Sequence, residues 1–369
     1  MSETSALDAT SETEELANTA RAVCADHPAE SVEQPPGRLW ETLEELGLAR
    51  LTLSESAGGS GGTLADAAAL LLTAGEAAAP VPLAETDLLA GWLLDRAGLA
   101  VPAGPLAAAA DGGELTVRSG QDGSVTVTGA LARVGWARHA ARIAVLAAGT
   151  NGADVVLSID PAADGVEIVP GTNLAGEPRD GVRLDTEVAP ADVAVAPPGT
   201  RDLLARRAAL ARALLLAGAA GSALASSVRY AGERVQFGRP IAKFQAVQQQ
   251  LALAAAEVAA ARASAMAAAR ICAAARVNSD GDFEGPDAEF AVAVAKGRTG
   301  EAASAVARIA HQVHGAIGFT LEHDLRLATT RLWSWRDEDG SDAHWHTVVG
   351  RRALAEGPDG LWPLLTRAS

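Results

Sequence analysis

Residues 234–245 read Arg-Val-Gln-Phe-Gly-Arg-Pro-Ile-Ala-Lys-Phe-Gln, and residues 312–319 read Gln-Val-His-Gly-Ala-Ile-Gly-Phe. Each stretch follows a long segment rich in Ala and contains residues that end a helix. In the first stretch Gly238 and Pro240 turn the chain. In the second, Gly315 and Gly318 allow positive backbone angles and a close approach to a ligand. Either stretch alone is a common helix end, but the two in this order are specific.

Long helices are expected on both sides of these turns. Apolar periodicity in the C-terminal part predicts three or four long helices with short links, which favours an antiparallel bundle. The N-terminal part is also expected to be helical, from Glu12 to about Ala110. The predicted C-terminal helices run from Arg201 to Glu233, from Ile241 to Ala275, from Asp287 to Val313, and from Leu325 onward.

Between these helical parts the sequence changes to short β-rich runs separated by Gly, Asp and Asn. Because no helical segment intervenes, the runs predict an antiparallel barrel or sandwich rather than a doubly wound parallel sheet. The predicted domains are a helical domain (1–105), an antiparallel β domain (106–199) and a helical bundle (200–369). The predicted strands lie at 115–117, 125–128, 143–146, 155–159, 166–169 and 183–188.

The composition argues against several classes of function. A formal net charge of −16 disfavours nucleic-acid binding and an anionic membrane surface, both of which favour a basic face. We find no secretory signal pattern, and the longest apolar runs fall short of a membrane span, so a cytoplasmic protein is expected. The two cysteines, Cys24 and Cys272, fit a reducing compartment. The histidines lack metal-ligand spacing, so no metal site is predicted.

The order of helices, antiparallel β domain and helical bundle, together with the two turn motifs, resembles the acyl-CoA dehydrogenase family of flavoproteins. The resemblance covers nearly the whole length, and its sharp motifs lie in the C-terminal half. It implies a mostly α fold with an N-terminal helical domain, a central antiparallel β barrel or sandwich, and a C-terminal four-helix bundle. In that family an Arg-x-x-Phe-Gly turn and a Gln-x-x-Gly-Gly-x-Gly turn hold the FAD of the neighbouring subunit.

The resemblance gives the first motif a role in binding the FAD of a partner chain. Arg234 would hold the pyrophosphate, for which a planar guanidinium is well suited. Phe237 would pack on the adenosine side of the cofactor, with Gln245 nearby. The alternative is that Arg234 only complements a helix C-terminus and that Phe237 only packs against the helix.

The second motif would contact the adenine or ribose end of the same cofactor through Gln312, Gly315 and Ala316. Ala316 stands where the family usually has a second glycine, which is a small steric departure. The alternative is a helix C-cap without a ligand.

Two segments of the β domain depart from the family. The family's Thr-Glu-Pro-x-x-Gly-Ser-Asp-like segment contacts the flavin ring and the acyl-CoA, and here it reads Leu-Ala-Ala-Ala-Ala-Asp-Gly-Gly-Glu at residues 106–114. The family's Trp-Ile-Thr/Ser segment corresponds to Trp136-Ala137-Arg138, where Arg138 replaces the hydroxyl donor. The groups that would build this chain's own flavin site are therefore altered.

The chemistry of the family also needs a carboxylate base, which removes a proton from the carbon next to the thioester. The family's Glu-Gly-Thr tripeptide falls on Asp339-Gly340-Ser341, so Asp339 is the candidate catalytic residue. Its side chain is one methylene shorter than Glu, and it ends an acidic run, so a solvated loop is the alternative. The base position of some relatives falls near Ala208 and Ala209, which offer no carboxylate.

These observations favour a subunit of a heteromeric enzyme. This chain would contribute FAD contacts to a paralogous acyl-CoA dehydrogenase subunit in an α2β2 heterotetramer. The enzyme would form an α,β-double bond in an acyl-CoA, by analogy one with a bulky or steroid side chain, and would pass electrons to electron-transfer flavoprotein or a similar acceptor. Two alternatives stay open: a self-sufficient homomeric enzyme with Asp339 as base, and a non-catalytic assembly subunit that binds no flavin.

Overall fold

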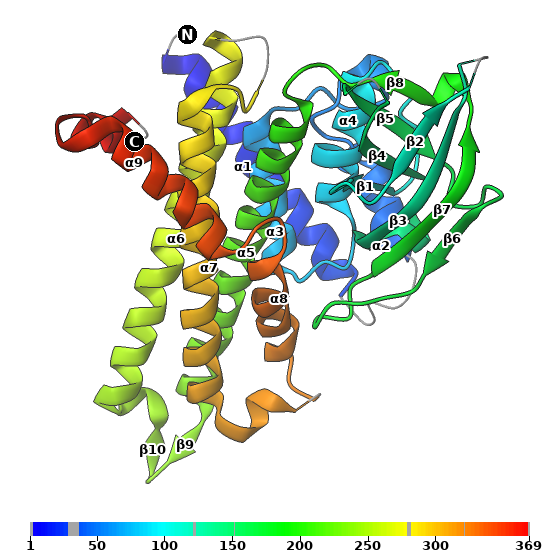
Figure 1. Cartoon of the computed structure of the whole chain (residues 1–369). Coiled ribbons are helices and arrows are strands. Elements are labelled where there is room, and N and C mark those ends of the chain that lie inside the picture. Colours follow the sequence, from blue (N-terminus) through cyan, green and yellow to red (C-terminus); the bar gives the residue numbers. More distant parts are fainter. Residues whose placement is uncertain are drawn as a thin grey trace. The chain divides into compact units, whose positions relative to one another are not determined.

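The computed structural model describes residues 3–28, 37–120, 123–150, 152–278, 282–320 and 322–367 (Figure 1). The chain divides into two compact units. The bundle unit comprises Met1–Pro28, Leu64–Ala79 and Ala209–Ser369, and the sheet unit comprises Ala29–Thr63 and Pro80–Ala208. These units group the chain by packing, whereas the predicted domains 1–105, 106–199 and 200–369 group it by type of element.

Helices build the bundle unit because its segments are rich in Ala and Leu, which favour helix. The helices are α1 (Glu3–Asp26), α3 (Leu64–Glu76), α5 (Thr200–Glu233), α6 (Gln245–Asn278), α7 (Gly285–His314), α8 (Leu325–Asp337) and α9 (Asp342–Arg367). Two glycines let α3 and α5 approach closely. A Cβ added to Gly75 would lie 2.3 Å from the carbonyl oxygen of Leu215, and one on Gly218 would lie 2.1 Å from that of Leu72. The predicted long C-terminal helices are thus confirmed.

Both predicted turns are present at helix ends in the bundle unit. The first is a short hairpin of β9 (Val235–Gln236) and β10 (Arg239–Pro240), which continues through the 3-10 helix η5 (Ile241–Lys243) into α6. The second follows α7 directly and forms the 3-10 helix η6 (Gly315–Phe319).

The sheet unit contains two four-stranded sheets with the orders β1-β4-β5-β8 and β2-β3-β7-β6. Apolar side chains from both sheets, among them Val127, Ile143 and Val182, share one buried core. The strands are β1 (Leu106–Ala110), β2 (Thr116–Ser119), β3 (Val125–Gly135), β4 (Arg142–Ala148), β5 (Asp154–Ile159), β6 (Val166–Val169), β7 (Arg179–Val188) and β8 (Val193–Val195). The helical elements of this unit are α2 (Gly37–Glu45), η1 (Glu55–Ala57), η2 (Ala84–Gly91, a π-helix), α4 (Trp92–Arg96), η3 (Ala137–His139) and η4 (Pro190–Asp192).

The prediction of helix up to about Ala110 is wrong at its end, because residues 106–110 form strand β1. Alanine favours helix in isolation. Here, however, Ala107 pairs with Ile143 of β4, and both residues are fully buried. Pairing in the sheet therefore overrides the local preference. Strands β1 and β4 are parallel, so this mainly antiparallel region contains a parallel pair.

The prediction that no apolar run reaches a membrane span is wrong on length and composition alone. Helix α5 and residues 245–275 of α6 reach mean hydropathies of 1.6 and 1.4 over 18 residues. The apolar window of α5 is 72% buried inside the structure, as in the core helix of a soluble protein. The apolar window of α6 is only 22% buried, but two helices that pass on length and composition alone are weak evidence for a membrane.

Candidate functional site

The first motif forms the β9–β10 hairpin at one end of the bundle (Figure 1). The Ile241 N–H donates a hydrogen bond to the Arg234 carbonyl oxygen at 2.8 Å, which closes the hairpin. Phe237 at its tip has φ 51°, in the left-handed region, and is 90% exposed. Its ring meets that of Phe244 edge-on at 6.1 Å. A bulky residue held in this conformation is an outlier of the kind that gathers at functional sites.

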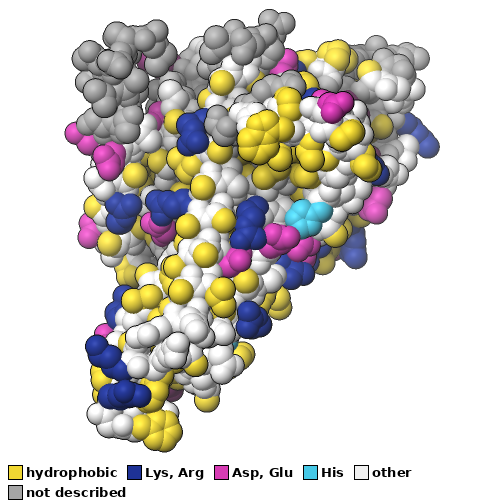
Figure 2. Space-filling view, turned by 90° about the vertical axis from the view of Figure 1, so that its left-hand side faces the viewer, with side chains coloured by type: hydrophobic (Ala, Val, Ile, Leu, Met, Phe, Trp, Pro, Cys, Tyr) yellow, Lys and Arg dark blue, Asp and Glu magenta, His cyan; other side chains and the backbone are white. Residues whose placement is uncertain are grey.

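The hairpin is cationic although the chain as a whole carries a charge of −16. Arg234, Arg239 and Lys243 are all exposed, and residues 234–245 contain no Asp or Glu. The Arg239 guanidinium lies 4.4 Å from the centroid of the Phe244 ring. Figure 2 shows Lys and Arg side chains beside hydrophobic ones at the lower tip, at the level that β9 and β10 occupy in Figure 1. Such a surface suits a ligand with a phosphate group and an aromatic ring.

The second motif leaves its backbone open. Gly315 has φ 66° and ψ −143°, and its N–H donates to the His311 carbonyl oxygen, which caps α7. A Cβ added to Gly315 would meet nothing within 4 Å, so the chain leaves room for a ligand at this point. Gln312 and Ala316 are exposed, and Phe319 is 70% exposed.

The two motifs meet through a pair of stacked rings. Tyr230 lies one turn before Arg234 on α5 and stacks on His314, the last residue of α7, with ring centroids 4.5 Å apart and an angle of 24° between the planes. His314 lies within the second motif, but no sequence signal indicated its contact with Tyr230, since the two are far apart in the chain. Their contact places both turns at the same end of the bundle.

All six residues predicted to bind cofactor lie on or beside these turns and are exposed: Arg234, Phe237, Gln245, Gln312, Gly315 and Ala316. Cationic donors, an unburied aromatic ring and an open glycine backbone fit the pyrophosphate and the adenosine of FAD. The contact of each residue with the cofactor stays a prediction.

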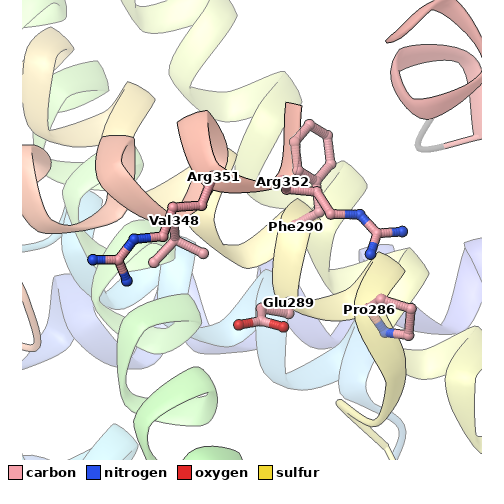
Figure 3. Close-up of a pocket in the computed structure, with 6 residues that line it drawn as sticks. All are labelled: Pro286, Glu289, Phe290, Val348, Arg351 and Arg352. Atoms are coloured by element: carbon pink, nitrogen blue, oxygen red, sulfur yellow. The ribbon is translucent and has the colours of Figure 1, made fainter. Parts of the chain in front are cut away.

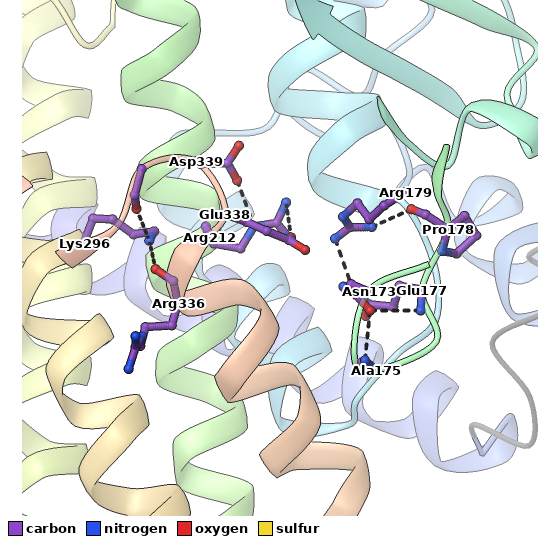
Figure 4. Close-up of polar contacts among 11 residues, drawn as sticks. Asn173, Ala175, Glu177, Pro178, Arg179, Arg212, Lys296, Arg336, Glu338 and Asp339 are labelled. Atoms are coloured by element: carbon purple, nitrogen blue, oxygen red, sulfur yellow. Dashed lines mark hydrogen bonds and ion pairs between the residues drawn. The ribbon is translucent and has the colours of Figure 1, made fainter. Parts of the chain in front are cut away.

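Asp339 lies in the loop between α8 and α9 and is ion-paired (Figure 4). Its Oδ2 accepts a hydrogen bond from Arg212 Nε at 2.9 Å, and Arg212 Nη2 also lies 3.5 Å from Glu338. The Arg212 side chain is 7% exposed, against 25% for that of Asp339. The ion pair with Arg212 orients this carboxylate toward the inside of the bundle unit. Its predicted role as base stays untested, and the geometry gives it a structural role.

Lys296 holds the same loop from inside the bundle. Its Nζ donates to the carbonyl oxygens of Arg336, at 2.8 Å, and Gly340, at 2.7 Å (Figure 4). Burial is the main reason why the pKa of Lys296 falls to about 8, while the nearby carboxylate of Asp339 acts in the opposite direction. The loop that carries Asp339 is therefore fixed by buried polar contacts.

Arg138, which replaces the family's hydroxyl donor, is turned inward in the sheet unit. Its backbone N–H donates to Asp180 Oδ2 at 2.9 Å, its Nε donates to Asp180 Oδ1 at 2.8 Å, and its Nη2 reaches the Gly171 carbonyl oxygen. Asp180 is fully buried. Beside it, Arg179 and Glu177 form a second buried pair at 3.3 Å (Figure 4). The donors at this position are committed to the chain itself.

In the altered segment at residues 106–114, one carboxylate oxygen is bound by backbone groups of its own loop. Asp111 Oδ1 accepts hydrogen bonds from the backbone N–H groups of Gly113, Glu114 and Leu115, at 2.9, 2.8 and 3.1 Å. Three backbone donors that could have faced a ligand therefore bind a side chain of the same loop.

A cavity of about 270 Å³ lies between α7 and α9 (Figure 3). It was not predicted from the sequence. Its lining combines apolar side chains with arginines and a carboxylate: Pro286, Glu289, Phe290, Val348, Arg351 and Arg352. No group of three or more His, Cys, Asp or Glu residues among the described parts of the chain could hold a metal ion.

Two family models match the chain. The acyl-CoA dehydrogenase N-terminal domain matches residues 10–100, and the acyl-CoA dehydrogenase C-terminal domain matches residues 202–354. The second match contains both turn motifs and Asp339.

Relatives of known sequence or structure agree with these matches. The acyl-CoA dehydrogenase IpdE2 of Mycolicibacterium smegmatis is 32% identical over 295 residues, which are 78% of this chain and 79% of the relative. The solved structure of the steroid ACAD Tcur3481-Tcur3483 is 27% identical, with a TM-score of 0.80, covering 95% of this chain and 99% of that one. The ChsE4-ChsE5 complex from Mycobacterium tuberculosis, 24% identical over 94% of this chain and 98% of that one, shares the fold with a TM-score of 0.81. The chain is therefore a member of the acyl-CoA dehydrogenase family, and this membership indicates FAD as its cofactor.

Proposed function

We propose that this chain is one subunit of a heteromeric acyl-CoA dehydrogenase and that it completes an FAD site on a paralogous partner, in an α2β2 assembly. The chemistry that bound FAD would supply is acceptance of a hydride from the carbon β to the thioester, and together with removal of a proton from the α carbon by a base this would form the α,β-double bond. The part of this chain is to bind and orient the cofactor. Arg234 holds the pyrophosphate, Phe237 packs on the adenosine side, and Gln312 and the open backbone at Gly315 contact the adenine or ribose end.

The observation that carries this proposal is the contrast between the two sets of donors. The backbone N–H and the guanidinium of Arg138 both donate hydrogen bonds to buried Asp180. At position 138 the family has a hydroxyl that supports the flavin ring. At the hairpin, Arg234 and Phe237 are exposed and the local charge is positive. The side chains that could contact a partner's cofactor are therefore exposed, whereas the donors at the position of this chain's own flavin site form hydrogen bonds within the chain.

The proton acceptor is expected on the partner. Asp339 is paired with Arg212, so it is poorly placed to act as a general base. This favours the heteromeric reading over a homomeric enzyme in which Asp339 is the base.

The substrate we propose is a bulky acyl-CoA, such as one with a steroid side chain. The support is that a steroid ACAD is among the similar structures. We also propose electron-transfer flavoprotein as the acceptor, from the family resemblance, and a cytoplasmic location, because a chain of this length with only two cysteines has no disulfide framework.

Flavin stoichiometry tests the proposal. We would measure flavin absorbance per chain for the protein purified alone and for the protein co-expressed with its paralogous partner. Little FAD alone and about one FAD per heterodimer together is the expected result. One FAD per chain in the protein alone would refute the heteromeric reading.

A matched pair of variants in the co-expressed complex tests the cofactor contacts. Arg234→Ala should lose FAD, and Arg270→Ala, an exposed arginine near the other end of α6, should keep it. Unchanged flavin content and activity in Arg234→Ala would instead identify a non-catalytic assembly subunit.

A further inference from the structure

Three rings form a stack at the base of both turn motifs. His314 lies 4.5 Å from Tyr230, nearly parallel, and 4.8 Å from His323, at an angle of 75°. His323 also meets Tyr230 edge-on at 6.1 Å. Tyr230 belongs to α5, one turn before Arg234, and His314 directly precedes Gly315. The stack is therefore a side-chain contact that joins the support of one turn to the support of the other.

The hydrogen bond of His314 to the Ala310 carbonyl oxygen fixes the tautomer of the neutral ring. Its Nδ1 lies 2.8 Å from the Ala310 carbonyl oxygen, which can only accept, so Nδ1 carries the proton. The lone pair is then on Nε2, which is buried and has no hydrogen-bond partner in the described structure. His314 is 4% exposed. A proton on Nε2 would create a buried N–H and a charge with no acceptor.

The surroundings of His314 also oppose a positive charge. The charged or titratable groups that act on it are His323 from the loop before α8, His311 from α7 and Arg229 from α5, all of which are cationic when protonated. Burial is the largest cause that lowers the pKa of His314, and these three groups act in the same direction, whereas the hydrogen bond to the Ala310 carbonyl oxygen raises it; the net direction is downward.

We infer that Tyr230 and His314 are positioning residues, which hold the two cofactor turns in register only while His314 is neutral. The inference rests on the proposed function, since it assumes that both turns contact one FAD. Protonation of His314 would put a charge into the stack and push apart the ends of α5 and α7. The affinity for FAD should therefore decrease as the pH falls.

The first test is the dissociation constant of FAD from the co-expressed complex between pH 5.5 and pH 8. In the wild type this constant should rise about tenfold for each pH unit below the pKa of His314, because binding then requires loss of a proton. His314→Phe keeps a stacked ring that cannot titrate. It should bind FAD within about threefold of the wild type at pH 8 and should lose the excess acid sensitivity.

Removal of a ring from the stack should weaken FAD binding at every pH. Tyr230→Leu should weaken FAD binding about tenfold even at pH 8, whereas Tyr230→Phe should restore it, because the stack needs a ring and not a hydroxyl. His344→Phe, on exposed His344 of α9, is the control for a histidine outside the stack. Circular dichroism and the melting temperature of each variant would show whether it folds.

A second readout needs no cofactor. Tyr230 is the sole tyrosine of the chain, so labelling the full chain with 3-fluorotyrosine gives a single fluorine resonance at the stack. This resonance should titrate below pH 6.5 in the wild type and in His344→Phe. Because His323 also lies 6.1 Å from Tyr230, the His314→Phe change is compared in a background that carries His323→Phe, and there it should stop the titration.

The outcomes separate this inference from the proposed function. If Arg234→Ala loses FAD while Tyr230→Leu keeps it, or if His314→Phe keeps the wild-type pH dependence, the positioning role is refuted and the proposed function stands. If Arg234→Ala also keeps FAD, the proposed function itself fails.

Discussion

Asp339→Asn distinguishes a structural carboxylate from a catalytic base. The substitution removes the charge that faces Arg212 Nε at 2.9 Å but keeps an oxygen that can accept the same hydrogen bond. Arg212 is 7% exposed, so its charge depends on protein partners, and Glu338 remains 3.5 Å from its Nη2. We therefore expect an effect on stability and not on chemistry.

The size of that effect follows from the geometry. Breaking a buried ion pair by removal of one partner costs about 3–5 kcal/mol when the remaining charge has no other partner. Here Glu338 still pairs with Arg212, and the Asp339 side chain is 25% exposed, so solvent screens part of the interaction. We expect a loss of about 1–2 kcal/mol in the free energy of unfolding, or a melting temperature lower by roughly 1–3 °C for a chain of 369 residues.

The assay compares unfolding in urea with the turnover of the co-expressed complex. Under the proposed function the base is on the partner, so activity should stay within about threefold of the wild type, whereas loss of a general base costs about 10²–10⁴-fold in rate. In a double-mutant cycle with Arg212→Met, the coupling energy between residues 212 and 339 should account for most of the stability lost in Asp339→Asn. A drop in activity of two or more orders of magnitude with an unchanged melting temperature would refute the reasoning and make Asp339 the base.

Three further substitutions test other parts of the structure. Burial raises the pKa of Asp87 to about 6 from an ordinary 3.8, so the folded state takes up a proton as the pH falls. In urea titrations, the free energy of unfolding of the wild type should increase relative to that of Asp87→Asn by about 1.3 kcal/mol from pH 7 to pH 5. The pKa of Lys296 is near 8 instead of 10.5, so the pH dependence has the opposite sign. From pH 7 to pH 9 the free energy of unfolding of the wild type should increase relative to that of Lys296→Met by about 1.3 kcal/mol. Neutral Lys296 still donates to both carbonyl oxygens. Phe237→Ala should change stability by less than about 0.5 kcal/mol, because the ring is exposed, yet should release FAD from the complex several-fold faster in a flavin-fluorescence assay.

The sequence predicted the long helices well because their signal is local. Apolar periodicity and helix-ending residues such as Gly238, Pro240 and Gly315 act within a few residues of where they stand. Residues 106–110 were predicted wrongly because their fate depends on β4, which lies more than thirty positions away. An Ala run carries no information about a strand partner, so propensity alone favoured helix.

In the candidate site, too, the features with a local sequence signal were predictable and those that depend on distant residues were not. The turn motifs could be found from sequence, because each is a short run with a fixed spacing. The stack of Tyr230 on His314 and the pair of Arg138 with Asp180 could not, because each joins residues that only the folded chain brings together. Asp339 was found from its place in a tripeptide, but its partner Arg212 lies on another helix and changes how the carboxylate is interpreted.

Phe237 provides an argument for a partner that does not depend on family membership. A residue other than glycine in the left-handed region costs of order 1 kcal/mol, and a ring that is 90% exposed recovers little of this through burial. Asn or Gly would form the same hairpin with less strain. The neighbours Arg234, Arg239 and Lys243 add like charges to the same short segment. The Phe244 ring, which contacts both Phe237 and Arg239, compensates for part of this within the chain. The exposed ring and the gathered charges therefore favour a surface or ligand outside the chain as the source of the rest.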